Sequence, residues 1–267
     1  MVTQDIPPLA PRPLGAINLL GVRTLIDKEI SRFMNASLQT VVAPVISTLL
    51  FFGMFAFVLG GDSSRGGVTL SFLVPGLVMM ALAQNSFMNT AGSLVLSKLQ
   101  GNIVDVLMPP LSSLELTIGY VVGGAVRGLV VGALCLGALS FFAPVHLSDL
   151  FFVLYFSISG SVMLALMGLI CGIWAEDFDG LIAVQSFFIM PATILSGTFY
   201  TLDSLPEEWR PLCLFNPFFY MIDGFRYGII GTADSVIPVG MVCLLVVNLV
   251  LLAVAYGLFE SGYKLKA

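Results

Sequence analysis

The feature that most constrains this chain is a series of six apolar runs separated by short polar connections. An α-helix needs about 20 residues to cross the hydrocarbon core of a bilayer, because it rises about 1.5 Å per residue. Runs of this length predict an all-α polytopic membrane protein with six transmembrane helices. We place the six spans at residues 38–59, 72–96, 116–142, 150–173, 181–199 and 237–259.

The composition supports a membrane location and excludes several classes of function. Hydrophobic residues make up 58% of the 267 residues and charged residues 10%, whereas soluble domains contain about 25% charged residues. The 11 lysines and arginines form no basic patch, so we expect no nucleic-acid partner. The sequence has no metal-site spacing of cysteine or histidine and no GxxxxGK(S/T) phosphate-binding loop. We therefore expect no catalytic residues, metal or cofactor in this chain.

The basic residues predict the orientation of the chain, because lysine and arginine concentrate in cytoplasmic connections. Six spans place both termini on one side. With cytoplasmic termini, the inside residues are Arg12, Arg23, Lys28, Arg32, Lys98, Lys264 and Lys266. The outside residues are then Arg65, Arg210 and Arg226. This excess inside favours cytoplasmic termini.

Two different segments precede the first span. Residues 1–16 are rich in proline and poor in apolar residues, which predicts a disordered cytoplasmic tail. In residues 18–33, apolar side chains recur every three or four positions opposite a polar face, which predicts an amphipathic helix. This helix is either an interfacial element with a role of its own or an ordinary juxtamembrane helix. Its candidate interfacial residues are Arg23, Lys28, Glu29 and Arg32.

Glycines repeat every four residues in the third and fourth spans. Small residues at this spacing give membrane helices a smooth face for close approach, so we interpret them as packing surfaces. The residues are Gly124, Gly128 and Gly132 in the third span, and Gly168 and Gly172 in the fourth.

Two connections on the predicted cytoplasmic side are candidates for contact with a partner. Residues 97–112 contain apolar positions at helical spacing and two successive prolines, which predicts a short helix that could fit a groove on another protein. Any helix on a membrane surface shows a similar pattern. Residues 174–180 carry three acidic side chains, a composition typical of a solvated turn and also compatible with a partner contact.

Arg127 is the one charged residue deep inside a predicted span. An arginine at mid-membrane costs about 2.5–3.5 kcal/mol on insertion scales, so it should face other helices or a wet cavity. Its side chain acts either as a hydrogen-bonded clamp between helices or as a substrate-pathway or gating residue. The polar residues that it could meet are Gln84, Asn85, Asn89, Gln185 and Asn248.

The stretch from Leu205 to Gly231 fits neither a plain span nor an ordinary loop. It is too apolar for water, whereas its prolines and charged residues exclude a simple transmembrane helix. Asn216 followed by Pro217 is typical of a helix start, and Gly231 is typical of a helix end.

The predicted helix after Pro217 has a polar face. Tyr220, Asp223 and Tyr227 lie on one side at spacings of three and four residues, and Arg226 can pair with Asp223. Lipid offers no hydrogen-bond partners, so these groups need partners inside the protein.

These features together resemble one family, the membrane permease subunits of type-2 ABC transporters, which have the type V exporter fold. The resemblance covers residues 18–262 and is strongest to small bacterial inner-membrane permeases with a separate ATPase, including relatives of Nod-factor and polysaccharide exporters. The most specific part is the pattern Gly197-x-Phe-Tyr…Leu205-Pro…Trp209…Asn216-Pro-x-x-Tyr220…Asp223-Gly-x-Arg226-Tyr…Gly231.

The resemblance implies a function and partners. Residues 17–267 would form one transmembrane domain that moves a glycan, lipid-linked or drug-like substrate out across the bacterial inner membrane. It implies a homodimer of permeases among membrane lipids, with two ATPase subunits on the cytoplasmic side that bind ATP and magnesium. The alternative from another class is a non-transporting membrane scaffold that recruits an ATPase.

The resemblance also implies roles for two segments. Residues 97–112 would contain the coupling helix that contacts the ATPase, and residues 200–232 would be an external re-entrant hairpin that acts as a gate. The coupling candidates are Lys98, Gly101, Asn102, Ile103, Asp105, Leu107 and Pro109. The gate candidates are Leu205, Pro206, Trp209, Asn216, Pro217, Tyr220, Asp223, Arg226 and Tyr227.

Overall fold

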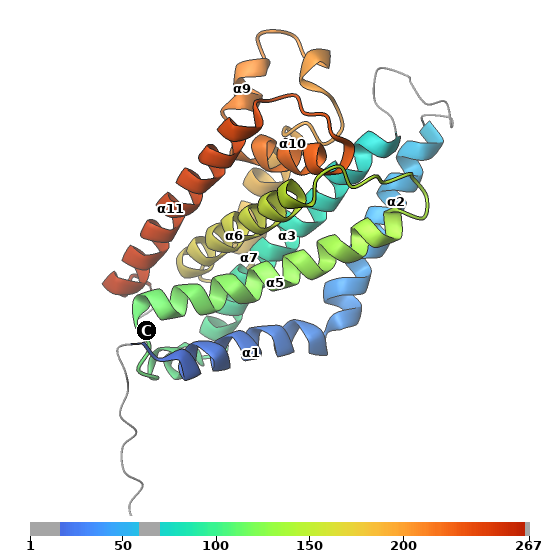
Figure 1. Cartoon of the computed structure of the whole chain (residues 1–267). Helices are drawn as coiled ribbons and strands as arrows, with labels where there is room; N and C mark the ends of the chain where they lie inside the picture. Colours follow the sequence, from blue (N-terminus) through green and yellow to red (C-terminus); the bar gives the residue numbers. More distant parts are fainter. Residues whose placement is uncertain (1–16, 59–69, 265–267) are drawn as a thin grey trace, which may run out of the picture.

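The computed structural model describes residues 17–58 and 70–264, which form a bundle of long helices with short helices at both ends (Figure 1). Within these ranges every regular element is helical, and this confirms the predicted all-α polytopic architecture. The predicted tail, residues 1–16, lies outside the described residues, as do Leu59 and Arg65.

In the described ranges, five helices are long and apolar enough to cross a membrane. The first, Leu38–Val58, consists of a π-helical turn (Leu38–Val42) and α2 (Ala43–Val58). The other four are α3 (Leu70–Leu99), α5 (Ser113–Leu139), α6 (Leu150–Trp174) and α11 (Ile237–Ser261). They correspond to the first, second, third, fourth and sixth predicted spans, with ends that differ by a few residues.

The fifth predicted span is shorter in the structure. It corresponds to Phe178–Ile194, which comprises α7 (Phe178–Val184), a π-helical turn (Gln185–Ile189) and α8 (Met190–Ile194). The helix stops before residue 199 because the chain turns at Gly197, which has a φ of 71°. An apolar run can therefore continue past the end of its helix.

The remaining helices lie at the two ends of the bundle. At one end are α1 (Leu19–Asn35) and α4 (Ile103–Leu107). At the other are a 3₁₀ turn (Leu202–Ser204), α9 (Arg210–Leu214) and α10 (Pro217–Ile230). The chain bends at Ala36 between α1 and the first span, so α1 lies across the end of the bundle (Figure 1).

Helix α3 is the centre of the bundle. In the most apolar window of α3, 78% of the residues are buried inside the chain, against 17% for the first span and 11% for α11. Its neighbours approach through the glycines: Gly128 of α5 contacts Ser86, and Gly168 of α6 contacts the carbonyl oxygen of Phe87. The predicted use of the glycine repeats in packing is confirmed.

The described chain begins and ends at the same end of the bundle. There the Asn18 side chain donates a hydrogen bond to the carbonyl oxygen of Pro110 at 3.3 Å, and Lys264 pairs with Glu176 at 2.8 Å. Helices α9 and α10 lie at the opposite end (Figure 1). This arrangement agrees with termini on one side of the membrane; that this side is cytoplasmic stays a prediction.

Candidate functional site

The segment with the coupling candidates is a tight turn followed by a single short helix. Gly101, with a φ of 72°, turns the chain after α3, and α4 covers only Ile103–Leu107 within residues 97–112. Two prolines at 109 and 110 prevent the helix from continuing. Ile103 is buried, whereas Asn102 and Asp105 are exposed. The segment thus presents a small surface that is polar at Asn102 and Asp105 and apolar at Val104 and Met108. Leu107 is partly buried and Pro109 is exposed.

Lys98 holds this segment to the neighbouring helix. Its ammonium group donates hydrogen bonds to the carbonyl oxygens of Ile173 and Ala175, the latter at 3.0 Å, at the end of α6. A cation in this position also interacts favourably with the negative end of the helix dipole. Lys98 therefore links α3 to α6 rather than extending toward a partner.

The start of α5 fixes the other side of the turn. Ser112 and Glu115 form a capping box, in which the Glu115 carboxylate accepts hydrogen bonds from the Ser112 backbone and hydroxyl groups at 2.7 and 2.9 Å. The same carboxylate accepts a hydrogen bond from the backbone N–H of Asn18. The beginning of α1, the coupling turn and α5 are thus held together.

Helix α1 buries a charged residue. Its buried face consists of Leu25, Glu29 and Phe33, and Glu29 has no exposed surface. The Glu29 carboxylate pairs with Arg32 at 2.8 Å and accepts a hydrogen bond from the Ser93 hydroxyl at 2.6 Å. Glu29 therefore lies inside the protein, which differs from the interfacial position that the sequence predicts.

Arg32 completes the link between α1 and α3. Its guanidinium group donates hydrogen bonds to the side-chain and backbone oxygens of Asn89 at 3.0 and 2.8 Å. Arg23 and Lys28, by contrast, lie on the exposed face that the sequence predicts. The spacing of four between Leu25, Glu29 and Phe33 is the signal that could have placed Glu29 on the buried face.

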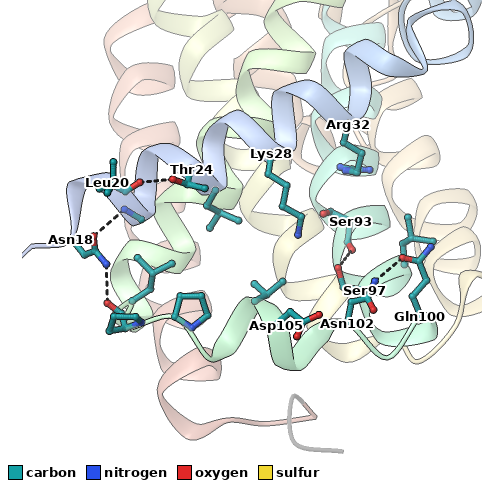
Figure 2. Close-up of a pocket in the computed structure, with 17 residues that line it drawn as sticks. Asn18, Leu20, Thr24, Lys28, Arg32, Ser93, Ser97, Gln100, Asn102 and Asp105 are labelled. Carbon is teal, nitrogen blue, oxygen red and sulfur yellow. Dashed lines mark hydrogen bonds between the residues drawn. The ribbon is translucent and has the colours of Figure 1, made fainter. Parts of the chain in front are cut away.

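A cavity of about 750 Å³ separates α1 from α4 (Figure 2). Lys28 extends into it from α1, and Asn102 and Asp105 approach from the opposite wall. The remaining lining is mixed: it includes apolar residues such as Leu25 and Val106 and polar residues such as Ser97. The coupling and interfacial candidates thus share one site at this end of the bundle.

At the opposite end, α10 has the boundaries that the sequence predicts. The side chain of Asn216 accepts a hydrogen bond from the backbone N–H of Phe218 at 3.1 Å, and Pro217 is the first helical residue. Gly231 ends the helix with a φ of 81°. Helix α10 packs against α3, α6 and α11, and most of its side chains are buried.

Asp223 and Arg226 form a buried ion pair on α10. Their closest charged atoms are 3.6 Å apart, and the exposed fractions of their side chains are 0% and 2%. The Asp223 carboxylate also accepts hydrogen bonds from the backbone N–H groups of Asp234 and Ser235, each at 2.9 Å, and from the Ser235 hydroxyl at 2.6 Å. Asp223 therefore fixes the loop between α10 and α11.

Arg226 connects α10 to two other segments. It donates a hydrogen bond to the carbonyl oxygen of Gly197, and its guanidinium carbon lies 3.8 Å from the centroid of the Phe72 ring in α3. The predicted pairing with Asp223 is confirmed by the structure; the Gly197 and Phe72 contacts have no local signal in the sequence. They join segments distant along the chain.

The other gate candidates fall into two groups. Pro206 and Trp209 are exposed in the loop before α10, with Leu205 partly buried beside them. Tyr220 and Tyr227 are partly buried on α10, where Tyr220 lies beside Gly240 and Tyr227 meets the Phe152 ring edge to face at 5.2 Å. The polar face of α10 therefore packs on neighbouring helices.

Comparison with known proteins identifies the family. The model of the family described as "ABC-2 type transporter" matches residues 21–230, from α1 to the end of α10. The chain belongs to the ABC-2 type transporter family.

A relative in Escherichia coli K12, the "Inner membrane transport permease YadH", is 36% identical over 251 residues. The alignment covers 93% of this ABC-2 permease and 98% of the relative. Proteins of the same name from Escherichia coli O157:H7 and Shigella flexneri match to the same extent. The predicted family and membrane-transport function are confirmed, and the inner-membrane location agrees with these names. Membership of the family implies partnership with an ABC ATPase subunit.

Within this ABC-2 permease, Arg127 lies at a second cavity, of about 350 Å³. Its guanidinium group donates a hydrogen bond to the Asn85 side chain at 3.0 Å, and Gln84 and Gln185 line the same space. The amide of Asn248 bonds instead to Ser159. The clamp between α5 and α3 is therefore present, and it lies beside a cavity.

These sites are suited to binding and to fixing helices. Among the described residues, no group of three or more His, Cys, Asp or Glu side chains could hold a metal ion. The charged groups that the site residues contribute are mostly committed to ion pairs and to backbone hydrogen bonds.

Proposed function

We propose that this permease moves a substrate out across the inner membrane, powered by ATP hydrolysis on a separate ABC ATPase subunit. Two permease copies and two ATPase subunits form the complex. The transported molecule is a glycan, a lipid-linked molecule or a drug-like molecule. ATP and magnesium bind to the ATPase, because this chain contains no phosphate-binding loop of its own.

The observation that carries this proposal is the surface that α1 and α4 form on either side of their shared cavity at one end of the bundle. Asn102 and Asp105 are exposed, whereas the residues beneath them are fixed by Ile103 and by the Lys98 hydrogen bonds to α6. A partner bound to such a surface moves α4 together with α3, because the connection between them is a short, hydrogen-bonded turn. ATPase movements can therefore reach the spans without unfolding the turn.

The opposite end supports a role in controlling exit. Helix α10 is held by Asp223 and Arg226 to the following loop and to α3. A helix with this many internal partners can stay ordered at the membrane edge, where lipid supplies none. We propose that α10 and the preceding loop form the external gate.

A second permease copy is the proposed neighbour of the outer helices. The first span and α11 bury only 17% and 11% of their most apolar windows within the chain. Their remaining faces are available to lipid and to another copy. The mass of the purified complex, after subtraction of bound lipid and detergent, would report two permease chains if this arrangement is correct.

The coupling proposal is tested with the permease and its cognate ATPase reconstituted in vesicles. Asn102→Trp and Asp105→Trp should reduce ATPase association or uncouple hydrolysis from solute movement, because a bulky ring occupies the contact surface. His146→Trp, an exposed change in the connection between α5 and α6 and outside the proposed gate, is the matched control. Unchanged association, hydrolysis and transport in both α4 variants would contradict the coupling role.

The same vesicles distinguish export from the scaffold alternative. An export permease moves solute across the membrane in an ATP-dependent way and stops when the ATPase is omitted. A scaffold would bind and stimulate the ATPase without any solute movement. Solute accumulation and ATP hydrolysis are therefore measured in the same preparation.

A further inference from the structure

The cavity beside Arg127 lies between the first span, α3, α5 and the segment that begins with α7. Its polar lining consists chiefly of Gln39, Gln84, Asn85, Arg127 and Gln185. We propose that this cavity binds an oxyanion of the phosphate type, carried as the headgroup of an amphiphile or present as free phosphate. The inference rests on the proposed transport function, because it assigns an anionic group to the transported molecule.

The charge of Arg127 is the first reason. Four other arginines in the described ranges, at positions 23, 32, 210 and 226, lie within 4.0 Å of a carboxylate. Arg127 is hydrogen-bonded to the neutral amide of Asn85, and its buried Nε atom has no hydrogen-bond partner among the described residues. Within residues 17–58 and 70–264, no carboxylate lines the cavity. A positive charge at this depth is costly, and a bound oxyanion would compensate it.

The second reason is the presence of uncommitted amide groups around the guanidinium. The side chains of Gln84 and Gln185 are partly exposed to the cavity and make no hydrogen bond to another described residue. Each carboxamide carries two N–H donors, and arginine supplies a planar set of donors that suits phosphate. The bond to Asn85 fixes the orientation of the guanidinium group, and Gln84 and Gln185 line the same cavity.

The backbone supplies a third, independent reason. The structure describes two π-helical turns, Leu38–Val42 and Gln185–Ile189, and each contributes a glutamine to this cavity. Such turns are rare and occur frequently at functional sites. The glutamines are Gln39 in the first turn and Gln185 in the second. Two uncommon backbone features thus converge on the space that Arg127 faces.

The size and remaining lining indicate what the cavity accepts. A volume of about 350 Å³ equals roughly twelve molecules of liquid water at about 30 Å³ each. It holds a phosphate group and a few methylene groups but not a whole lipid or a glycan. The apolar lining, which includes Phe51, Met80 and Met88, suits the first part of an alkyl chain. The remainder of the molecule would extend outside the cavity.

The test measures binding to the full-length permease without an ATPase, in nanodiscs of phosphatidylcholine. The probe is dodecyl phosphate, and dodecanol is the uncharged comparison. Arg127→Gln should raise the Kd for dodecyl phosphate by about tenfold or more, because hydrogen bonds to a charged group are lost. Arg127→Lys should give an intermediate Kd, since it retains the charge and loses the planar donors. Arg210→Gln, which removes an arginine outside the cavity, should leave the Kd unchanged.

Two further variants keep the proposal testable if Arg127→Gln fails to fold. Gln84→Leu and Gln185→Leu leave the bond between Arg127 and Asn85 intact. Each should raise the Kd for dodecyl phosphate about threefold or more. A wild-type Kd in these variants and in any folded Arg127→Gln protein would overturn the proposal. Equally tight binding of dodecanol would also overturn it, because the cavity would then recognise only the alkyl chain.

Competition with inorganic phosphate distinguishes the two sources of the oxyanion. If inorganic phosphate displaces dodecyl phosphate, the site binds the free ion; if it does not, the site requires an amphiphile, and either result supports oxyanion recognition. A permease that couples to its ATPase and exports solute, but binds no alkyl phosphate, would remove this site and leave the proposed function in place. A permease that binds alkyl phosphate but neither couples to its ATPase nor exports solute would keep this site and contradict the proposed function.

Discussion

Each end of the bundle contains an acid and an arginine three residues apart on one helix, with the acid completely buried. At the α1 end the pair is Glu29 and Arg32, separated by 2.8 Å. At the α10 end it is Asp223 and Arg226, separated by 3.6 Å. Both pairs reach α3, through Ser93 and Asn89 at one end and through Phe72 at the other.

The two pairs differ in what they hold. Asp223 binds two backbone N–H groups of the next loop, so it fixes the local course of the chain. Glu29 binds only side chains, and Arg32 is 28% exposed beside the large cavity, whereas Arg226 is 2% exposed. A carboxylate held only by side chains, one of which has access to water, can change partners at lower cost than a carboxylate held by backbone N–H groups. The comparison indicates that the α10 end is fixed and that the α1 end can adjust to a partner.

The largest expected effect comes from Asp223→Ala. It removes three hydrogen bonds and leaves Arg226 as a buried charge without its acid, so the free energy of unfolding should fall by about 3–5 kcal/mol. Thermal unfolding and the yield of folded protein measure this loss. Asp203→Ala is the control, because Asp203 is 93% exposed and its pair with Arg210 is long, at 3.9 Å. Wild-type stability and export in Asp223→Ala would contradict both the fixed end and the gate.

Glu29→Gln should have a smaller effect on stability and a larger one on coupling. The amide can still accept the Ser93 hydrogen bond, and Arg32 can turn toward water, so the free energy of unfolding should fall by about 1.5–3 kcal/mol. The loosened α1 should reduce ATPase stimulation. Asp27→Asn, which alters the exposed pair with Arg23, should change neither quantity. If Glu29→Gln destabilised the protein more than Asp223→Ala, the ranking of the two ends would be reversed.

Gly128→Ala tests how much the close packing of α5 on α3, between the two ion pairs, contributes to stability. A methyl group at this position would collide with the Ser86 hydroxyl and lie 2.9 Å from the carbonyl oxygen of Leu82. Separation of α5 from α3 should lower the free energy of unfolding by about 1–3 kcal/mol. In the same helix, Gly137 faces open space, so Gly137→Ala should be neutral or stabilising by about 0.5–1 kcal/mol. Equal effects of the two variants would show that close packing on α3 is unimportant.

The smallest expected effect concerns an exposed pair at the α1 end. The hydrogen bond from Lys264 lowers the pKa of Glu176, and the same bond raises the pKa of Lys264. The stabilisation that ionised Glu176 gives to the folded protein is present above its ordinary pKa of 4.5. It is lost as the pH falls through the lowered pKa. The stabilisation from protonated Lys264 is present below its ordinary pKa of 10.5. It is lost as the pH rises through the raised pKa.

The C-terminal contact should therefore persist from about pH 5 to pH 10 and loosen outside this window. Protease sensitivity of the C-terminus across the pH range measures the change. Glu176→Gln should show the loosened state at every pH, and Asp179→Asn is the control. A C-terminus equally protected at pH 3 and pH 7 would show that this pair contributes nothing, as many exposed pairs do.

The features that the sequence predicts correctly depend on local signals. Asn216, Pro217 and Gly231 define the ends of α10 through capping rules that involve neighbouring residues only. The pairing of Asp223 with Arg226 follows from their spacing on one helix. Hydropathy places the long helices for a similar reason, because each must satisfy its own backbone within the membrane.

The features that the sequence does not reveal depend on contacts between distant segments. Glu29 is buried because Ser93 and Arg32 satisfy its carboxylate, and only Arg32 is near it in the chain. The partners of Asp223 in the following loop and the shortness of the fifth membrane segment are set by how the chain turns at Ser235 and at Gly197. Hydropathy measures the apolar run and carries no information on where such turns occur.

Because α3 is long, a small rotation at one end of it produces a larger displacement at the other end. Its 30 residues correspond to about 45 Å, and it contacts α1 near one end and Arg226 near the other. If α3 pivots about its last turn by about 5°, its far end sweeps about 4 Å. That is longer than a hydrogen bond and enough to pull the Phe72 ring away from Arg226. A slight tilt of α3 at the α4 end would thus displace the end of α3 that packs against α10, where Phe72 meets Arg226.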